Sequence, residues 1–257
     1  MPRILLVCEY DGTDFAGYQS QKNGRTVQDV LAKACSGLYE KQITLTGCSR
    51  TDAGVHARCH LSHADVPFFI PEENVPLALN SRLPGDLSVR RAMYVRDDFS
   101  ARTCVLGKRY VYRIYTGRTP SPLHARYMYF CPHEPDVSLM NEEAKAFAGE
   151  HDFAAFCAAG SSQKTTVRRL TGVVARRDAS QDNIIEIEVT GEAFLYNMVR
   201  IIAGTLLDLG IGRADMLSVA DIIRSCDRQK AGRTLPAKGL TLEEVFFDEP
   251  SARNYNI

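Results

Sequence analysis

Alternating apolar and polar positions along the chain predict a series of short β-strands. The clearest is the segment 108–116 (KRYVYRIYT), where Tyr110 and Tyr112 fall on one face and Arg109 and Arg113 on the other. Further strands are expected at residues 4–9, 43–47, 61–66, 87–95, 166–177, 183–190 and 243–247. The strands occur in both halves of the chain.

Apolar residues at helical spacing predict the helices between these strands. The pattern is clearest at 27–39, and Thr26, followed three residues later by Asp29, is a suitable helix start. Further helices are expected at residues 72–80, 139–148, 194–209 and 218–225. Strands mixed with helices in both halves indicate an α+β fold with two layered lobes.

Composition predicts a large core and no membrane segment. The chain has 257 residues, 45% of them apolar, which is enough to bury a substantial core. Its most apolar later stretch, 194–212, is interrupted by Arg200 and Asp208, so we expect no membrane span. The eight cysteines contain no C-x-x-C pair, which favours free thiols and a cytoplasmic location.

Charge is balanced in total but unevenly distributed. The chain has 31 basic and 31 acidic residues. Residues 99–133 and 153–177 nevertheless contain no acid, while they carry six and five basic residues respectively. Because the distribution of charge matters more than its sum for partners, these two basic blocks favour a phosphate-bearing partner such as RNA.

The sequence GCSRTDAGVHA, residues 47–57, is the strongest candidate for chemistry. It places Asp52 close to Arg50 in a glycine-flanked turn between two predicted strands. An aspartate in such a turn often only bonds to the local backbone. It can also be a carboxylate nucleophile or base that a nearby cation keeps ionised. The residues of this turn alone leave both interpretations open.

Six segments, in the same order along the chain, resemble the tRNA pseudouridine synthase A family. They are EYDGTDFAGYQ (9–19), TVQDVL (26–31), RTDAGVHA (50–57), LPGDLSV with DDFSAR (83–102), KRYVY (108–112) and FLYNMVRIIAGTL (194–206). A single R-T-D would be weak, but the ordered set covers nearly the whole chain and is specific.

The resemblance implies an isomerase that breaks the N1 glycosidic bond of a uridine, rotates the uracil and rejoins it through C5. Neither a metal nor a cofactor is implied, because no electron is moved and no group is carried in. The implied substrate is the tRNA anticodon stem-loop at uridines 38, 39 and 40, and the implied assembly is a homodimer. The expected lobes are 1–105 and 106–257, each an antiparallel sheet backed by helices, similar to an RNA-recognition-motif or ferredoxin-like half, with the active-site cleft between them.

The resemblance also implies roles for four residues. Asp52 would attack the sugar or the base, and Arg200 would pair with it. Tyr110 would stack on the uracil, and Arg50 would take the place of the flipped-out base. Each has a plain alternative: Tyr110 as a core aromatic, Arg50 as a surface cation and Arg200 as a cation interrupting an apolar helix. From the basic blocks we expect phosphate contacts by Lys108, Arg109, Arg168 and Arg169.

The chain departs from the family pattern at two positions. Ser49 stands where glycine is common before Arg-Thr-Asp, and Tyr18 replaces a frequent tryptophan. Tyr18 keeps an aromatic ring, whereas Ser49 could alter the loop. Neither position is one of the residues with an implied chemical role.

Two other functions remain as alternatives. A non-catalytic RNA-binding module would use the basic blocks and the tyrosines of 108–116 and would not need Asp52. A zinc hydrolase would use the residues of HARCHLSH, namely His56, Cys59, His60 and His63. The zinc site is disfavoured because no glutamate follows His56 and because the segment has the pattern of a loop and a strand.

Overall fold

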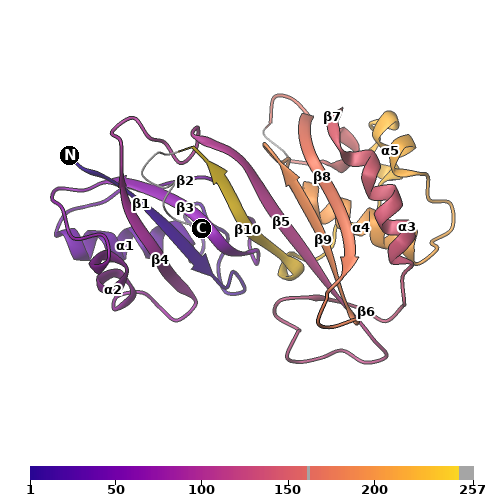
Figure 1. Cartoon of the computed structure of the whole chain (residues 1–257), viewed down its shortest axis with the longest axis horizontal. Coiled ribbons are helices and arrows are strands. Elements are labelled where there is room, and N and C mark those ends of the chain that lie inside the picture. The colour runs from indigo at the N-terminus through magenta and orange to yellow at the C-terminus, as the bar shows by residue number, and fades with distance from the viewer. Residues whose placement is uncertain (161–162, 249–257) are drawn as a thin grey trace. The chain divides into compact units, whose positions relative to one another are not determined.

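The computed structural model describes residues 1–160 and 163–248, and it has the mixed α and β structure that the sequence predicts (Figure 1). Contacts divide the chain into two compact units. Unit 1 comprises Met1–Leu106 and the residues from Leu242 on, and unit 2 comprises Gly107–Thr241. This division differs at its C-terminal end from the expected lobes, which assigned everything after residue 105 to the second lobe. The last strand contributes to unit 1 because Leu242 and Val245 are buried there.

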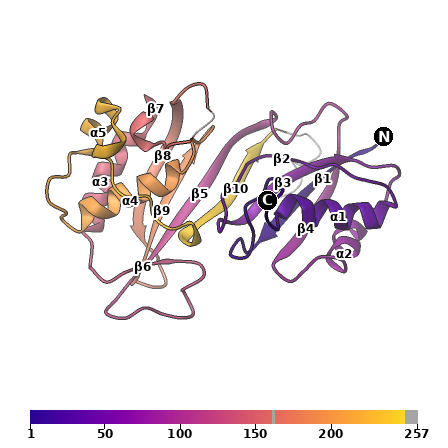
Figure 2. The same ribbon diagram turned by 180° about the vertical axis from the view of Figure 1, so that it is seen from behind.

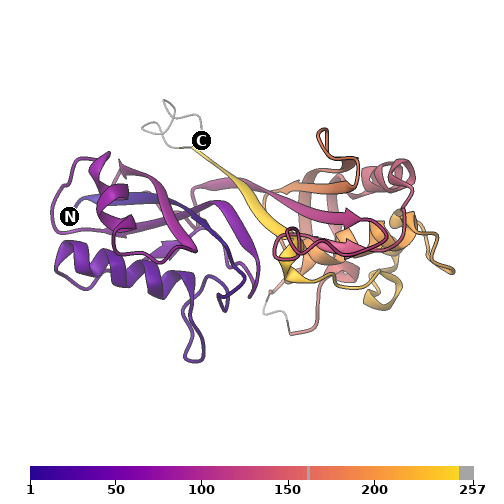
Figure 3. The ribbon, with the colours of Figure 1, turned by 90° about the horizontal axis from the view of Figure 1, so that it is seen from below.

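Unit 1 is a sheet with two helices. Its strands are β1 (Arg3–Tyr10), β2 (Thr46–Gly47), β3 (His56–Asp65), β4 (Leu87–Val95) and most of β10 (Leu240–Phe247), and its helices are α1 (Val27–Tyr39) and α2 (Asn74–Asn80). The sheet order is β4-β1-β3-β10, with β2 paired to β3, and β1 is antiparallel to both neighbours. Helix α1 lies on one face of these strands (Figure 2) and runs along that face when the unit is seen from below (Figure 3). Helix α2 contacts β4 and α1.

The core of unit 1 follows from the apolar pattern that predicts its elements. Leu5 of β1, Leu31 of α1 and Leu61 of β3 are fully buried. Helix α1 has the predicted bounds, and the Thr26 hydroxyl accepts a hydrogen bond from the backbone N–H of Asp29 at its start. The predicted strand at 43–47 is wrong except for its last two residues, and the Gln28 side chain donates to the Leu45 carbonyl in place of a sheet neighbour.

Unit 2 contains the remaining strands of the chain's one sheet and three helices. Its strands are β5 (Val105–Thr116, beginning in unit 1), β6 (Tyr129–Cys131), β7 (Gly149–Asp152), β8 (Val167–Arg177) and β9 (Ile184–Gly191). Its helices are α3 (Val137–Ala144), α4 (Met198–Gly210) and α5 (Val219–Ser225), with short 3-10 turns at Lys145–Phe147, Ala154–Phe156, Arg228–Lys230 and Ala237–Gly239. The order β5-β9-β8-β7 is antiparallel throughout.

Three features of unit 2 differ from the sequence prediction. Strand β6 is parallel to β5, so the sheet is not purely antiparallel, and neither β6 nor β7 was predicted. Helix α4 begins at Met198 rather than at 194 because Asn197 has a left-handed backbone. The buried α4 lies against one face of the sheet (Figure 2). Tyr112 of β5 and Ile187 of β9 are fully buried. Among the residues that the structure describes, no helix combines the length and apolarity that crossing a membrane requires.

Candidate active site

Asp52 lies on a tight turn in unit 1, in the loop of residues 48–55 between β2 and β3, which we call the Asp52 loop. The backbone N–H of Val55 donates to the Asp52 carbonyl at 3.1 Å, and Gly54 has φ +79°. These are the features of a type II turn, whose third residue needs positive φ and therefore favours glycine. Asp52 is half-buried and Arg50 is exposed, so the carboxylate has a more restricted position than the cation.

The loop that follows β1 packs directly on the Asp52 loop. Gly17 has φ +89°, and a Cβ placed there would lie 2.6 Å from the Thr51 carbonyl oxygen. A Cβ at Gly12 would lie 2.0 Å from the Val55 carbonyl oxygen. The backbone N–H of Tyr18 donates to the Thr51 carbonyl at 3.1 Å. Two of the segments that carry the family resemblance, 9–19 and 50–57, thus form one backbone unit, and glycine makes their close approach sterically allowed.

Buried side chains support the Asp52 loop from below. The hydroxyls of Tyr10 and Thr51 are 2.8 Å apart, and His60 Nε2 is 3.0 Å from the Ser49 carbonyl oxygen. The Tyr18 ring stacks on His60 with centroids 4.0 Å apart, and burial raises the pKa of Tyr18 above its usual value. Tyr18 can thus replace the larger tryptophan, and its hydroxyl bonds to a buried serine, Ser62, at 2.8 Å.

His56 and His63 of the HARCHLSH segment have backbone or carboxylate partners. His56 Nδ1 is 3.0 Å from the backbone nitrogen of Gly12 and 3.2 Å from an Asp11 carboxylate oxygen. His63 Nδ1 accepts from the backbone N–H of Ala101 at 3.0 Å, and burial lowers the pKa of His63. Within residues 1–160 and 163–248, no three His, Cys, Asp or Glu side chains are grouped as metal ligands. This arrangement gives the zinc alternative no support.

Tyr110 lies in unit 2, on β5. Its register partner is Val189 of β9, and it is 7% exposed. The ring of Phe194 meets it edge to face with centroids 5.1 Å apart. Tyr110 is therefore largely packed, as the plain alternative expects, and one neighbour is an aromatic from the FLYNMVR segment, which also carries Arg200.

Arg200 is half-buried near the start of α4. Its Nε donates to the Leu235 carbonyl at 2.7 Å, and its Nη1 donates to the Asn197 side-chain oxygen at 2.7 Å. The backbone N–H of Leu235 in turn donates to the Arg200 carbonyl at 3.3 Å. The guanidinium is thus held from two sides within unit 2.

The sheet of unit 2 brings the expected phosphate-binding residues to one end. Lys108 of β5 and Leu170 of β8 both pair with Gly191 of β9, so Lys108–Arg109 and Arg168–Arg169 lie two strands apart at the same end of the sheet. Arg168 donates to the carbonyl oxygens of its neighbours Thr165 and Val167, at 3.0 and 2.6 Å, and to a side-chain oxygen of Gln163 at 3.1 Å. The four residues therefore lie at one end of this sheet.

The basic blocks are less separated from acidic residues than the sequence indicates. Strand β9 lies between β5 and β8 and carries Glu186 and Glu188. Arg113 and Arg176 both pair with Glu186 at 3.0 Å, and Arg109 is 3.9 Å from Glu188. Strand pairing thus brings acids from a distant part of the sequence beside these three arginines.

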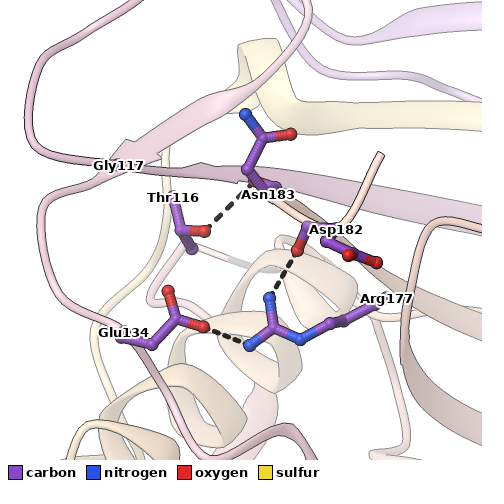
Figure 4. Close-up of a pocket in the computed structure, with 6 residues that line it drawn as sticks. All are labelled: Thr116, Gly117, Glu134, Arg177, Asp182 and Asn183. Carbon is purple, nitrogen blue, oxygen red and sulfur yellow. Dashed lines mark hydrogen bonds and ion pairs between the residues drawn. The ribbon is translucent and has the colours of Figure 1, made fainter. Parts of the chain in front are cut away.

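A surface pocket of about 520 Å³ lies at another part of unit 2 (Figure 4). It is lined by Thr116, Gly117, Glu134, Arg177, Asp182 and Asn183. Arg177 donates to the Glu134 carboxylate and to the Asp182 carbonyl, as the dashed lines in Figure 4 show. None of the residues with an implied role lines this pocket.

Sequence reasoning missed several supporting residues. Gly12 and Gly17 allow the close backbone packing beneath Asp52, and their signal is visible in EYDGTDFAGYQ as two glycines five positions apart. Asn197 and Leu235 hold Arg200, and only the asparagine directly before the helix could have indicated a special backbone position.

Comparison with known proteins agrees with this set of motifs. The family model described as tRNA pseudouridine synthase matches residues 6–102 and 144–248. The chain therefore belongs to the tRNA pseudouridine synthase family, whose members are isomerases acting on uridine in tRNA, and the resemblance read from six segments is confirmed.

Individual relatives carry the name of one enzyme within this family. A protein of Acetivibrio thermocellus named tRNA pseudouridine synthase A is 44% identical over 96% of this chain and 100% of its own length. One of Bacillus subtilis with the same name is 41% identical over 96% of this chain and 99% of its own. A chain from the crystal structure of a Cbf5-Nop10-Gar1 complex aligns with 80% of this chain and 44% of its own, with 14% identity and a TM-score of 0.37.

Proposed function

We propose that this protein converts uridine to pseudouridine at positions 38, 39 and 40 of the tRNA anticodon stem-loop. Family membership supports the reaction. The choice of positions follows from the resemblance to the tRNA pseudouridine synthase A family, whose name relatives at 41 to 44% identity carry. The observation that carries the proposal is the construction of the Asp52 loop. Gly12, Gly17 and Gly54 together allow the close backbone packing that fixes the turn on which Asp52 lies.

In the proposed reaction Asp52 is the nucleophile, attacking the sugar or the base. The bond from uracil N1 to the ribose breaks, the uracil rotates, and C5 bonds to the same ribose carbon. The hydrogen at C5 leaves as a proton, and N1 gains one, so the step needs no oxidant, reductant or carried group. Arg200 keeps Asp52 ionised, Tyr110 stacks on the uracil, and Arg50 fills the space of the flipped-out base.

The protein around this chemistry is proposed to be a cytoplasmic homodimer. Lys108, Arg109, Arg168 and Arg169 contact phosphates of the stem-loop, which fix the orientation of the RNA without reading its sequence. Their position at one end of the unit 2 sheet supports a shared RNA contact. The other candidate, a non-catalytic RNA-binding module, shares this contact but gives no function to the Asp52 loop.

Tritium release tests the proposal. The protein is incubated with unmodified tRNA carrying tritium at uridine C5, because rejoining through C5 must expel that hydrogen to solvent. We expect release from wild-type tRNA and none from a transcript with cytidine at positions 38, 39 and 40. Release that persists from the cytidine transcript would contradict the positions. Tight tRNA binding without any release would instead favour the non-catalytic module.

A further inference from the structure

Asn197 has an unusual backbone conformation at the start of α4. Its φ and ψ are 59° and 9°, in the left-handed region, where non-glycine residues are uncommon and asparagine is better tolerated than most. The residue at a helix start normally accepts a backbone N–H of the first turn with its side chain. Asn197 makes no such bond. Its side-chain oxygen instead accepts from Arg200 Nη1 at 2.7 Å.

The second partner of Arg200 is a fixed backbone carbonyl, that of Leu235. The segment before Leu235 lies so close to α4 that a Cβ at Gly204 would be 1.9 Å from the Arg233 carbonyl oxygen. The buried carboxylate of Asp208, two turns after Arg200, pairs with Arg233 at 3.0 Å. This packing makes the Leu235 carbonyl a rigid acceptor for Arg200 Nε.

Together, the two bonds fix the guanidinium group. Guanidinium is planar, and its donors have fixed directions. A bond from Nε alone sets one edge of the plane, whereas bonds from both Nε and Nη1 also fix its rotation about that edge. Asn197 supplies the second bond, and its side chain reaches Nη1 from a left-handed backbone that costs free energy without capping the helix.

We propose that Asn197 is a positioning residue for Arg200. Its left-handed backbone places the carboxamide where it orients the guanidinium, so Asn197 acts on the reaction through Arg200 and not on the uridine itself. This inference rests on the proposed function, because it takes from it the role of Arg200 in keeping Asp52 ionised. This positioning role accounts for the strained backbone of Asn197 at the start of the buried helix α4.

The test replaces Asn197 by glycine. Glycine adopts the same φ without strain, so Asn197→Gly removes the carboxamide and relaxes the backbone. We expect kcat for tritium release to fall by roughly 10- to 100-fold, with little change in KM for tRNA and no loss of melting temperature. A purely structural asparagine would lower the melting temperature and leave kcat close to wild type, which would overturn the proposal.

Asp215→Gly is the matched control. Asp215 is exposed, belongs to the same unit and has φ 64°, close to that of Asn197. The substitution relieves the same kind of backbone strain without removing a bond to Arg200. We expect its kcat to equal that of wild type. A loss of kcat equal to that of Asn197→Gly would show that strain relief, and not the missing carboxamide, causes the effect.

A double variant separates action through Arg200 from independent action. In an Arg200→Ala background, Asn197→Gly should cause no further loss of kcat, because the group that it positions is already gone. Losses that multiply would overturn the proposal. Because Arg200 is proposed to keep Asp52 ionised, its loss should leave less ionised Asp52 at neutral pH. The activity of both Arg200→Ala and Asn197→Gly should therefore recover in part as the pH is raised.

A measurement without substrate keeps this inference distinct from the proposed function. In ¹⁵N NMR spectra, the Arg200 Nε–H, bonded to Leu235, should exchange more rapidly with water in Asn197→Gly than in wild type. If wild-type protein releases no tritium, the proposed function is wrong, and the exchange rate still decides whether Asn197 orients Arg200. If wild type is active while Asn197→Gly matches it in both kcat and exchange, the positioning role is wrong and the function stands.

Discussion

Gly17 shows at the scale of a single residue how the Asp52 loop depends on its neighbour. Its φ of +89° and the 2.6 Å approach of a Cβ to the Thr51 carbonyl both exclude a side chain. We expect Gly17→Ala to lower the free energy of unfolding by about 1–3 kcal/mol. Because the displaced atoms adjoin Asp52, kcat for tritium release should fall as well. Urea unfolding and the tritium assay measure the two effects.

Two control variants divide the effect of Gly17→Ala into its causes. Gly37 lies inside α1, and a Cβ there meets nothing within 4 Å, so Gly37→Ala should stabilise the protein by about 0.5–1 kcal/mol. Gly212 has φ +68° but open surroundings, so Gly212→Ala reports backbone strain alone. If Gly17→Ala costs no more than Gly212→Ala and leaves kcat unchanged, close packing on Thr51 does not position Asp52.

His63 predicts a fall in stability on mild acidification. Burial, followed by the positive charge of Arg3, lowers the pKa of His63 below 6.5, and its Nδ1 accepts from the Ala101 N–H. His63 therefore binds a proton more readily in the unfolded chain than in the folded one. Its contribution to stability is full above pH 6.5 and is lost as the pH falls through the folded pKa. His63→Asn keeps an acceptor for Ala101 without titrating.

The measurement for His63 is the urea midpoint at pH 7.5 and pH 5.5. We expect a smaller drop between the two values in His63→Asn than in wild type. His133 is exposed, and His133→Asn should leave the drop unchanged. Equal drops in wild type and His63→Asn would mean that other groups cause the acid sensitivity.

At the residue scale, the sequence was enough to identify the motifs but not the contacts that backbone atoms make between distant segments. Asp52, on a glycine-flanked loop, could be singled out because its neighbours in sequence are also its neighbours in space. The packing of Gly17 against Thr51, and of Leu235 against Arg200, joins segments 34 or 35 positions apart through backbone atoms. No side-chain pattern encodes such contacts, so sequence periodicity could not predict them.

At the scale of elements, the outer edge of β4 is covered by side chains. Asn80 donates to the Val89 carbonyl at 2.9 Å and accepts from the Val89 N–H at 2.8 Å, as a neighbouring strand would. The Glu72 carboxylate accepts from the Tyr94 N–H at 2.6 Å. Side chains on an edge strand hinder pairing with other chains. The segment 72–80 thus protects a nine-residue edge.

Replacing Asn80 should therefore expose that edge. We expect Asn80→Ala to lower the free energy of unfolding by about 1–2 kcal/mol through the loss of two hydrogen bonds and to increase self-association at high concentration. Asn74 begins the same helix and is exposed, so Asn74→Ala is the matched control. Sedimentation velocity at several concentrations measures the association. Identical sedimentation of the two variants would contradict a protective role for Asn80.

Elements were predicted well where one face of the element is buried. Helix α1 and strand β4 have the predicted bounds because most of their apolar residues are buried. Strand β7 was missed because it has four residues, none of them fully buried, and β6 because it lies in a proline-rich segment with three residues. The start of α4 was misplaced because Phe194 and Leu195 continue the apolar pattern into a turn.

At the scale of the whole molecule, the paired charges of unit 2 predict which arginines contribute to RNA binding. Arg113 and Arg176 already pair with Glu186, whereas Arg169 is 3.9 Å from the exposed Glu192. We expect affinity for tRNA to fall steeply with salt and Arg169→Ala to reduce the slope of log K against log salt by about 1. Many tRNAs should be affected alike, because phosphates carry no sequence information.

The control for Arg169 is an arginine with no proposed RNA contact. Arg224 is exposed on α5 and pairs with Asp221. Arg224→Ala also removes one positive charge. If RNA binding depends on local contacts, this variant should leave the salt slope unchanged. Equal changes in both variants would mean that only the net charge matters and that Arg169 makes no specific phosphate contact.

The pattern of strands and helices predicted the class of fold but not the division of the chain. Apolar periodicity indicated the α+β class, which the structure has. Segregated charge indicated an RNA partner, in agreement with a family whose members act on tRNA. The pairing of β9 between the two basic strands, and the contribution of β10 to unit 1, depend on strand order. Strand order is set by long-range packing, which a local pattern does not contain.

The most direct test of the central claim is the turnover of Asp52→Asn. This variant removes the nucleophile while keeping the size of the side chain and the phosphate contacts. With C5-tritiated tRNA we expect release to be abolished and tRNA binding to stay close to wild type, while Asp215→Asn, at an exposed position in unit 2, keeps full activity. Retention of a tenth of wild-type turnover by Asp52→Asn, confirmed with Asp52→Ala, would contradict the assignment of Asp52 as the nucleophile.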